Sequence, residues 1–465
     1  MRISRAMGVF VTFLAIAALC SCGGGSSSST GTGTGQNTAS VFTVGTDASL
    51  PSVVSCQVMV TGVTIFNGTT NVPVLTTPQS VDFAQLSGLH QLLDLNAVPT
   101  GTYSSATVTI SSPVIGYIDT SKNPPVISTI NGTLSQSSVT VNLAAPFVVG
   151  NADLVGLRME FDLAKSLVTS AGQITGAVNP VFHMQLLSAT DANVSIDDFR
   201  AGVVAVTGSN TFIVQGPKGR QWTVQSNAST VMDDPSVPVS SFTTNTIVEV
   251  SGQLDTVTKN IDASEIEVVS NDGFVLAGLF TSIRPAAPQP ATAADLFVRS
   301  ELPDITGVQD GQITTLTLNN SEVYRIANIN NPITTLLFNN SSLVPGQSVG
   351  VGGKLVTTNG VSTLTVHRVV LRRQGQAGTW VPGSTTVQSG NSGSFQLTDN
   401  WTDGVLLPAP LTVLTTNATN FVNLSGLSAL SGTQAIPIRV VGFILYNSAT
   451  GGPVMVARAV AGLTN

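Results

Sequence analysis

The chain has 465 residues, of which only 9% are charged; 25 Asp and Glu outnumber 18 Lys and Arg, so the net charge is −7. Without a basic excess, the sequence excludes the electrostatic footprint of a nucleic-acid-binding protein. Its hydrophobic fraction of 42% excludes general disorder. The polar remainder is rich in Ser, Thr, Asn, Gln and Gly, a composition that favours many short strands joined by turns.

Residues 1–21 have the pattern of a secretion signal. Two Arg residues precede an apolar run at 7–19. A membrane-spanning helix needs about 20 apolar residues, so this run is too short to be one. The Leu-Cys-Ser-Cys run that follows resembles the lipobox of bacterial lipoproteins, in which a Cys is acylated, with palmitate as the usual label. We assign the anchor to Cys22, because acylation of Cys20 would place a bulky Leu directly before the modified residue. The alternative is an ordinary secretion signal with unrelated Cys residues.

Residues 22–40 are rich in Gly, Ser and Thr, and this composition predicts a flexible tether. By resemblance to other lipoproteins, Gly23 carries no Asp-type signal for retention at the inner membrane. We therefore expect a protein held at the outer membrane through its lipid anchor, facing the periplasm or the surface. After processing at Cys22 the one remaining thiol would be Cys56. Its parity with neighbouring Val residues predicts a small buried side chain rather than a reactive nucleophile.

Residues 41–190 are expected to form a β-sandwich domain. The stretch 53–66 is rich in Val, Ile and Thr, and Asn67-Gly68 then gives a strong turn signal before a returning strand at 72–75. A second turn at 99–103 leads through Tyr103 into the next strand. Further strands are expected at 126–130, 139–143 and 157–163, and the nearest helical candidate is 155–168.

The segments Thr46-Asp47, 58–66, 99–103, 160–166 and 179–181 follow one another in this region. Their order resembles a bacterial lipoprotein domain family, the domain-of-unknown-function 4382 family. The resemblance rests on the order of five segments and departs from the family at Ala48-Ser49-Leu50, which intervenes before Pro51. It implies a prealbumin-like β-sandwich and supplies no catalytic residue.

Three repeats follow, expected as small β-barrels at 199–270, 275–373 and 376–461. Each opens with Ala-Gly and closes with a Gly-x-apolar step, a turn and a strand; a pattern found three times is stronger evidence than one occurrence. Inside the blocks the pattern is a strand of the type Thr211-Phe212-Ile213-Val214, then Gly216-Pro217, then Gln221-Trp222-Thr223-Val224. This pattern resembles the domain-of-unknown-function 5666 family, which implies OB-like barrels. Closing each sheet into a barrel would remove its exposed edges. The recurring steps are Ala201-Gly202, Ala277-Gly278 and Ala377-Gly378, then Gly252-Gln253-Leu254, Gly353-Lys354-Leu355 and Gly442-Phe443-Ile444.

Motifs for chemistry are sparse. His90, His183 and His367 fall in different segments, and a zinc site needs three or four converging ligands, so no metal site is predicted. The acidic pairs Asp197-Asp198 and Asp233-Asp234 fit solvated turns better than a catalytic pair, because neighbours in a strand point to opposite faces. Calcium binding by these pairs stays open. No cofactor is expected.

Among the aromatic residues, Trp401 is the one candidate for ligand contact. It falls in a polar stretch that predicts a loop, where an indole can meet the apolar face of a sugar; the alternative is that it folds back over its own barrel. Trp222 alternates with Val224 and is expected in a core, whereas Trp380 is undecided.

The sequence therefore predicts an all-β, lipid-anchored envelope protein, not an enzyme, with a binding or structural role and polysaccharide as one candidate ligand. Two alternatives remain. One is an enzyme that acts on envelope glycans through dispersed Asp and Glu residues. The other is an adhesion or assembly subunit that binds envelope proteins.

Overall fold

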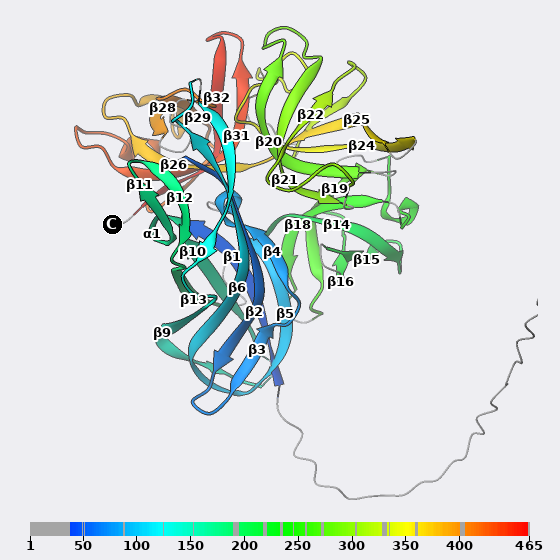
Figure 1. The fold of residues 1–465 in the computed structure, drawn as a ribbon, viewed down its shortest axis with the longest axis vertical. Helices are drawn as coiled ribbons and strands as arrows, with labels where there is room; N and C mark the ends of the chain where they lie inside the picture. Colours follow the sequence, from blue (N-terminus) through cyan, green and yellow to red (C-terminus); the bar gives the residue numbers. More distant parts are fainter. Residues whose placement is uncertain are drawn as a thin grey trace, which may run out of the picture. The chain divides into compact units, whose positions relative to one another are not determined.

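In the computed structural model, residues 37–465 form one compact unit (Figure 1). The predicted signal, Cys22 and most of the predicted tether lie outside the described residues. The structure describes residues 38–463 except 49, 51, 87–88, 124, 152, 189–194, 217–220, 233–235, 245, 256–257, 271–273, 303–304, 328–332, 334, 359–360 and 400–404.

The predicted all-β fold is confirmed, because strands make up nearly all the regular structure. In the described chain the α-helix α1 (Leu163–Ser166) spans four residues inside the stretch 155–168, most of which is strand. In the same part of the chain there is no helix of the length and apolarity that crossing a membrane requires. The first strand, β1 (Thr38–Ala48), begins three residues inside the predicted tether, since Thr38 already pairs with Pro99.

Two sheets with a shared apolar core form the β-sandwich, and a small three-stranded sheet lies beside them. In the first sheet, β1 pairs with one parallel and one antiparallel neighbour. That sheet has the order β13 (Phe182–Ser188), β10 (Leu154–Asp162), β1 and β5 (Gln91–Pro99). The second contains β2 (Val53–Phe66), β3 (Asn71–Leu75), β4 (Gln79–Asp82), β6 (Gly101–Asp119), β7 (Val126–Asn131) and β9 (Ser138–Val149). The third contains β8 (Thr133–Leu134), β11 (Leu167–Ser170) and β12 (Gln173–Val178).

Local sequence signals in the sandwich take the predicted form. Gly68 has a φ of 92° in the turn between β2 and β3, a conformation that glycine adopts without strain. Tyr103 opens the core-facing side of β6, is fully buried, and donates a hydrogen bond from its hydroxyl to the carbonyl oxygen of Pro99 over 2.8 Å. Cys56 is fully buried, as predicted.

Three further sheets follow in chain order, each made from one repeat. In the first and third, the pairings close into rings of five strands, because β16 joins β19 and β26 joins β28. In the second, β22 packs against β25.

The first barrel contains β14 (Ser195–Val206), β15 (Thr211–Gln215), β16 (Gln221–Gln225), β17 (Val231–Met232), β18 (Ile247–Leu254) and β19 (Ile261–Ser270). The second contains β20 (Phe274–Arg284), β21 (Ala293–Leu302), β22 (Ile313–Thr317), β23 (Val323–Ile326), β24 (Ser348–Thr358) and β25 (Val361–Leu371). The third contains β26 (Gln374–Trp380), β27 (Thr386–Ser389), β28 (Ser392–Asp399), β29 (Leu411–Thr415), β30 (Asn420–Val422), β31 (Pro437–Asn447) and β32 (Gly452–Gly462).

The glycine of each Gly-x-apolar step lies at the same structural feature. Gly252, Gly353 and Gly442 each sit at a register shift between the last two long strands of a barrel. A Cβ built on them would lie 2.0–2.2 Å from a carbonyl oxygen of the partner strand. The motif recurs because this close approach of two backbones admits no side chain.

The structure places one of the two acidic pairs and two of the three Trp residues. Asp197-Asp198 was expected in a boundary turn, but it lies within β14 at an irregularity between Ile196 and Phe199. Asp233-Asp234 lies outside the described residues. Trp222 is buried as predicted, and Trp380, which the sequence left undecided, is 1% exposed.

The second barrel carries an ion pair near its surface that makes stability depend on pH. Arg284 donates from Nη2 to Oδ1 of Asp295 over 2.7 Å, and this hydrogen bond lowers the pKa of Asp295 from 3.8. A carboxyl with a lowered folded-state pKa stabilises the fold above its unfolded pKa and loses that contribution as pH falls. Asp295→Asn should therefore lower the free energy of unfolding by less than about 1 kcal/mol at pH 7. In urea titrations, the difference from wild type should close below pH 3.8; a difference that stays constant with pH would contradict this assignment.

The sandwich and the barrels share apolar cores. Phe42 and Leu92 of the sandwich belong to the core of the first barrel, and Phe443 and Val456 of the third barrel belong to that of the second. Val54 of β2 packs with Leu279 and Phe297 of the second barrel. Residues 37–465 are thus continuous in their packing, and this packing encloses the cavity described next.

Candidate functional site

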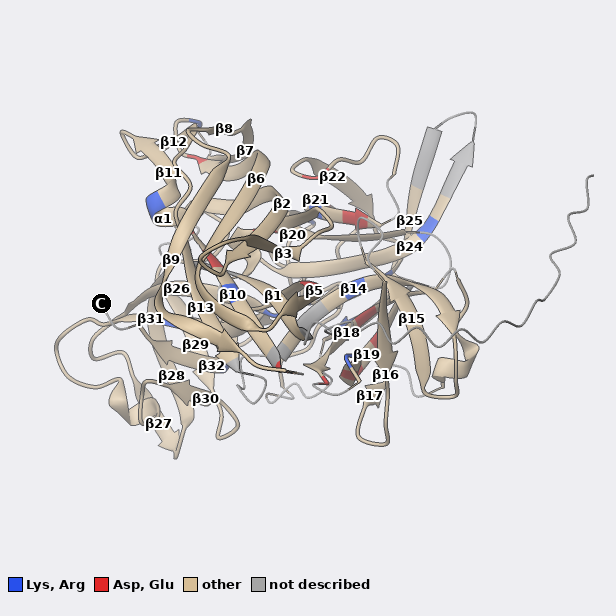
Figure 2. Cartoon of the chain, turned by 90° about the horizontal axis from the view of Figure 1, so that it is seen from below, with Lys and Arg blue, Asp and Glu red and all other residues tan. Residues whose placement is uncertain are grey.

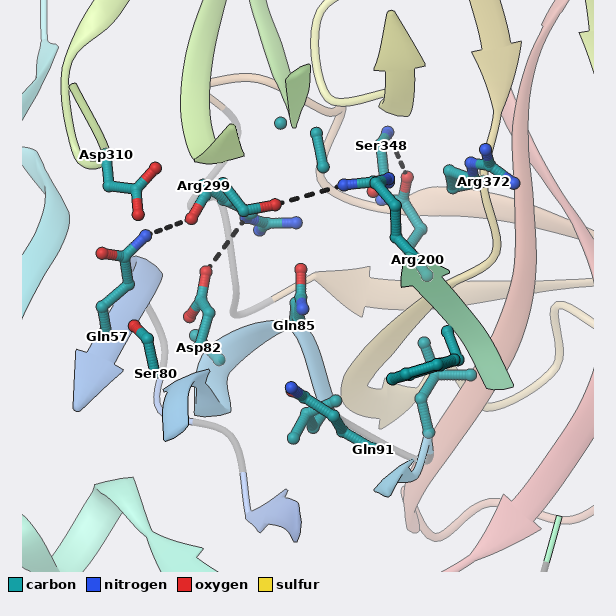
Figure 3. Close-up of a pocket in the computed structure, with 18 of the residues that line it drawn as sticks. Gln57, Ser80, Asp82, Gln85, Gln91, Arg200, Arg299, Asp310, Ser348 and Arg372 are labelled. Carbon is teal, nitrogen blue, oxygen red and sulfur yellow. Dashed lines mark hydrogen bonds and ion pairs between the residues drawn. The ribbon is translucent and has the colours of Figure 1, made fainter. Parts of the chain in front are cut away.

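A cavity of about 420 Å³ lies where the sandwich and all three barrels meet (Figure 3). Its volume is within the range of small-molecule sites. The sandwich contributes β2, β4, β5, β6 and the 3-10 helix η1 (Phe83–Leu86), and the barrels contribute β14, β16, β18, β20, β21, β24 and β26. Residues far apart in the sequence therefore line one space.

Charged groups gather at this cavity although they are rare in the chain. Figure 2 shows that most of the ribbon carries no charged residue. Four Arg residues and four acidic residues line the cavity, so their formal charges balance. They are Arg200, Arg299, Arg372, Arg373, Asp82, Glu249, Glu301 and Asp310.

One group of charges joins the first barrel to Arg372, which directly follows the last strand of the second barrel. Arg200 is the register partner of Glu249, which is the register partner of Glu267, so three neighbouring strands present them side by side. Nη2 of Arg200 lies 3.0 Å from Oε2 of Glu249, and Nη1 of Arg372 lies 2.8 Å from Oε2 of Glu267. Arg372 also pairs with Glu249. Both carboxylates are buried, and each is held by guanidinium groups.

A second pair fastens the sandwich to the second barrel. Nε of Arg299 on β21 lies 3.5 Å from Oδ2 of Asp82, and its Nη2 donates to the carbonyl oxygen of Val54 over 2.6 Å. Asp82 also accepts hydrogen bonds from the backbone N–H of Cys56 at 2.8 Å and the hydroxyl of Ser55 at 2.9 Å. Figure 3 shows Asp82 and Arg299 facing each other at one side of the cavity.

Burial opposes ionisation in both groups. Desolvation raises the pKa of Asp82, against the opposing effects of Arg299 and of the hydrogen bonds from Cys56 and Ser55. Desolvation likewise lowers the pKa of Arg200 and of Arg299, with their carboxylate partners acting in the other direction. The low dielectric makes each pair depend strongly on its partner.

Amide side chains form the next part of the lining. Gln374 and Gln376 lie two residues apart on β26 and hence on the same face. Gln374 is satisfied, because its Oε1 accepts from the backbone N–H of Ser348 at 2.8 Å and its Nε2 donates to the carbonyl oxygen of Gly346 at 3.0 Å. Both amide atoms of Gln376 lack a hydrogen-bond partner among the described residues. The six glutamines of the lining are Gln57, Gln79, Gln85, Gln91, Gln374 and Gln376.

An apolar surface completes the cavity. Trp222 and Phe199 line it from the first barrel, with ring centroids 6.3 Å apart and planes at 81°. Trp222 is 5% exposed. The apolar side chains beside them come mainly from the sandwich: Met59, Leu86, Leu89, Leu92, Leu93 and Val114, with Leu279 and Val349 from the second barrel. The arrangement can hold a small molecule that has polar groups and an apolar face.

The structure does not test the two site residues predicted from the sequence. Cys22 and Trp401 lie outside the described residues. His183 and His367 lie on β13 and β25, and the described part of the chain brings together no group of three His, Cys, Asp or Glu side chains that could hold a metal ion. The cavity was missed by sequence analysis. Its signal was Glu249, a charged residue amid the apolar residues of β18 in a chain where charge is rare.

Of the comparisons with known proteins, one finds a match, and it covers the N-terminal part of the chain. No curated protein and no solved structure matches the sequence. A family model does match residues 39–177, which cover most of the sandwich, as the sequence resemblance implied. That family is described as Domain of unknown function (DUF4382).

Proposed function

We propose that this chain is a non-catalytic binding protein of the bacterial cell envelope, anchored by lipid, whose cavity receives a small polar molecule. The cavity carries the proposal, since it combines a volume of about 420 Å³ with amide groups and an apolar wall. Known small-molecule sites also combine apolar side chains with polar groups that fix the orientation of the ligand; this lining carries more polar groups than most.

Two of the four acids that line the cavity, Glu249 and Asp82, are in a state that supports binding rather than catalysis. A general acid or base has to exchange a proton with its substrate. Glu249 is held by Arg200 and Arg372, and Asp82 by Arg299, Ser55 and Cys56. Acids held in this way fix the walls of the cavity in place.

The repeats and the N-terminus complete the proposal. The bulged glycine found in each barrel supports a common origin for the three repeats, in line with their resemblance to the domain-of-unknown-function 5666 family. The prealbumin-like character of the sandwich and the lipoprotein nature of the chain rest on sequence resemblance. The lipobox-like run ending at Cys22 would place the protein at the outer membrane.

Binding without turnover can be tested directly. The full chain is mixed with a panel of sugars, sugar phosphates, amino acids and nucleosides while thermal unfolding is followed. We expect at least one compound to raise the unfolding midpoint saturably, since ligand at 100 times its Kd stabilises a fold by about 2.7 kcal/mol. Mass spectrometry should recover that compound unchanged. A chemically converted compound would establish an enzyme, and a panel without any stabilising compound would contradict the binding role.

The anchor has its own prediction. In a bacterial host, labelled palmitate should enter the wild-type chain and be lost in Cys22→Ser, because the acylated Cys carries the lipid. Cys20→Ser is the matched control and should keep the label. Label that persists in Cys22→Ser, or that disappears in Cys20→Ser alone, would contradict the assignment.

A further inference from the structure

The amide of Gln376 points to the kind of molecule that the cavity takes. Gln376 is 1% exposed, and neither its Nε2 nor its Oε1 has a hydrogen-bond partner among the described residues. Buried polar groups are nearly always satisfied, so an orphaned pair of donor and acceptor calls for an explanation. Gln374, two residues earlier on the same face, has both of its amide atoms satisfied. On this strand, the amide of Gln374 is therefore bonded within the protein, and the amide of Gln376 is left to bond to a ligand.

A second amide with the same property comes from the sandwich. Gln79 on β4 is 7% exposed, lines the cavity, and has no hydrogen-bond partner for its Nε2 within the described chain. Gln85 and Gln91 also reach the cavity, and Figure 3 shows Gln85 between Asp82 and Arg200. The amides thus come from two distant parts of the sequence and line one space.

The charges of the cavity select against a charged ligand. Arg200 is paired with Glu249 and Arg299 with Asp82, and the four arginines and four acids of the lining balance formally. An anionic or cationic ligand would enter a buried site that carries no net opposite charge, which is unfavourable. A neutral ligand avoids that cost.

We propose that the cavity binds a short neutral saccharide of one or two sugar units, a proposal that rests on the binding function above. A hydroxyl group both donates and accepts, so it can satisfy the Nε2 and Oε1 of Gln376 together; a carboxylate accepts without donating and an ammonium donates without accepting. The hydroxyls of Ser80, Ser112 and Ser300 add similar partners to the lining. Trp222 and the apolar wall beside it receive the C–H face of the sugar ring.

The test compares neutral sugars with their charged counterparts. The full chain is purified in a detergent without a sugar headgroup, and calorimetry measures binding of glucose, galactose, mannose, N-acetylglucosamine, maltose and cellobiose. Glucuronate, glucose 6-phosphate and glucosamine form the charged set. We expect at least one neutral sugar to bind at least 10-fold more tightly than every charged sugar.

Two variants separate ligand contact from structure. Gln376→Leu should weaken that binding at least 10-fold while its unfolding midpoint without ligand stays at or above that of the wild type, because it removes an orphaned buried amide. The matched control Gln374→Leu should lower the unfolding midpoint, because it breaks the hydrogen bonds to Ser348 and Gly346.

Three other outcomes would contradict the saccharide class, the position of the site, or the binding function itself. If a charged sugar, an amino acid or a nucleoside binds best and Gln376→Leu abolishes that binding, the saccharide class is wrong and the binding function stands. Neutral sugar binding unchanged in Gln376→Leu would place the site elsewhere. If no compound of either panel binds, the saccharide proposal and the binding function both fail.

Discussion

Replacing Glu249 with Ala should lower the free energy of unfolding by about 3–5 kcal/mol, the range for breaking a buried ion pair by removal of one partner. Glu249 is 3% exposed and accepts from Arg200 over 3.0 Å, while Arg372 holds its other oxygen. Its removal leaves one guanidinium without its carboxylate and a second with only part of its charge compensation. The loss is measured from denaturation curves in urea, which leaves ion pairs unscreened, followed by circular dichroism.

The control for Glu249→Ala is Asp295→Asn, which disrupts an ion pair whose Arg284 is 48% exposed. Its effect should stay below about 1 kcal/mol, since solvent screens such pairs. Similar losses in the two variants would show that the buried cluster contributes no more than a surface pair. Unchanged stability in Glu249→Ala would contradict the placement of Glu249 between the two arginines.

Gly442→Ala should also destabilise the protein strongly, by about 3 kcal/mol, as expected when an added carbon forces a packed backbone to move. A Cβ on Gly442 would lie 2.0 Å from the carbonyl oxygen of Val456 on the paired strand β32. Relief would require the two strands to separate at the bulge, with loss of their hydrogen bonds. The measurement is the guanidinium chloride midpoint of the full chain.

Gly202→Ala is the matched control, because Gly202 is also a strand glycine of a repeat motif. A Cβ on Gly202 meets no atom within 4 Å, whereas one on Gly378, at the corresponding Ala-Gly step, would lie 2.2 Å from the carbonyl oxygen of Thr398. We expect Gly202→Ala to change the free energy of unfolding by less than about 1 kcal/mol, because only backbone entropy changes. Equal effects of Gly442→Ala and Gly202→Ala would contradict the steric explanation.

Local physical chemistry explains what sequence analysis could predict of the fold. Turn formation at Asn67-Gly68 and the alternation that buries Trp222 depend on neighbours within a few residues, so the sequence shows them directly. The repeated Gly-x-apolar step was visible because one backbone constraint acts three times, at Gly252, Gly353 and Gly442.

The cavity could not be predicted because its contacts are not local. Asp82 meets Arg299 and Arg200 meets Ser300 only after separate sheets pack together, and nothing near these residues in the sequence encodes the partner. A lone Gln such as Gln376 also gives no signal, because whether it is satisfied depends on surroundings built from other repeats. Sequence analysis turned to Trp401 instead, because a Trp within a polar stretch is recognisable without knowing the fold.

The sharing of cores between barrels constrains how this architecture can change during evolution. Phe443, Leu445, Val454 and Val456 of the last barrel complete the interior of the barrel before it. Deleting the last barrel would therefore expose apolar surface on its neighbour, and such exposed surface promotes aggregation. In many tandem-repeat proteins, single units are duplicated and lost freely; here the lineage is expected to keep the number of barrels fixed and to vary mainly in the loops.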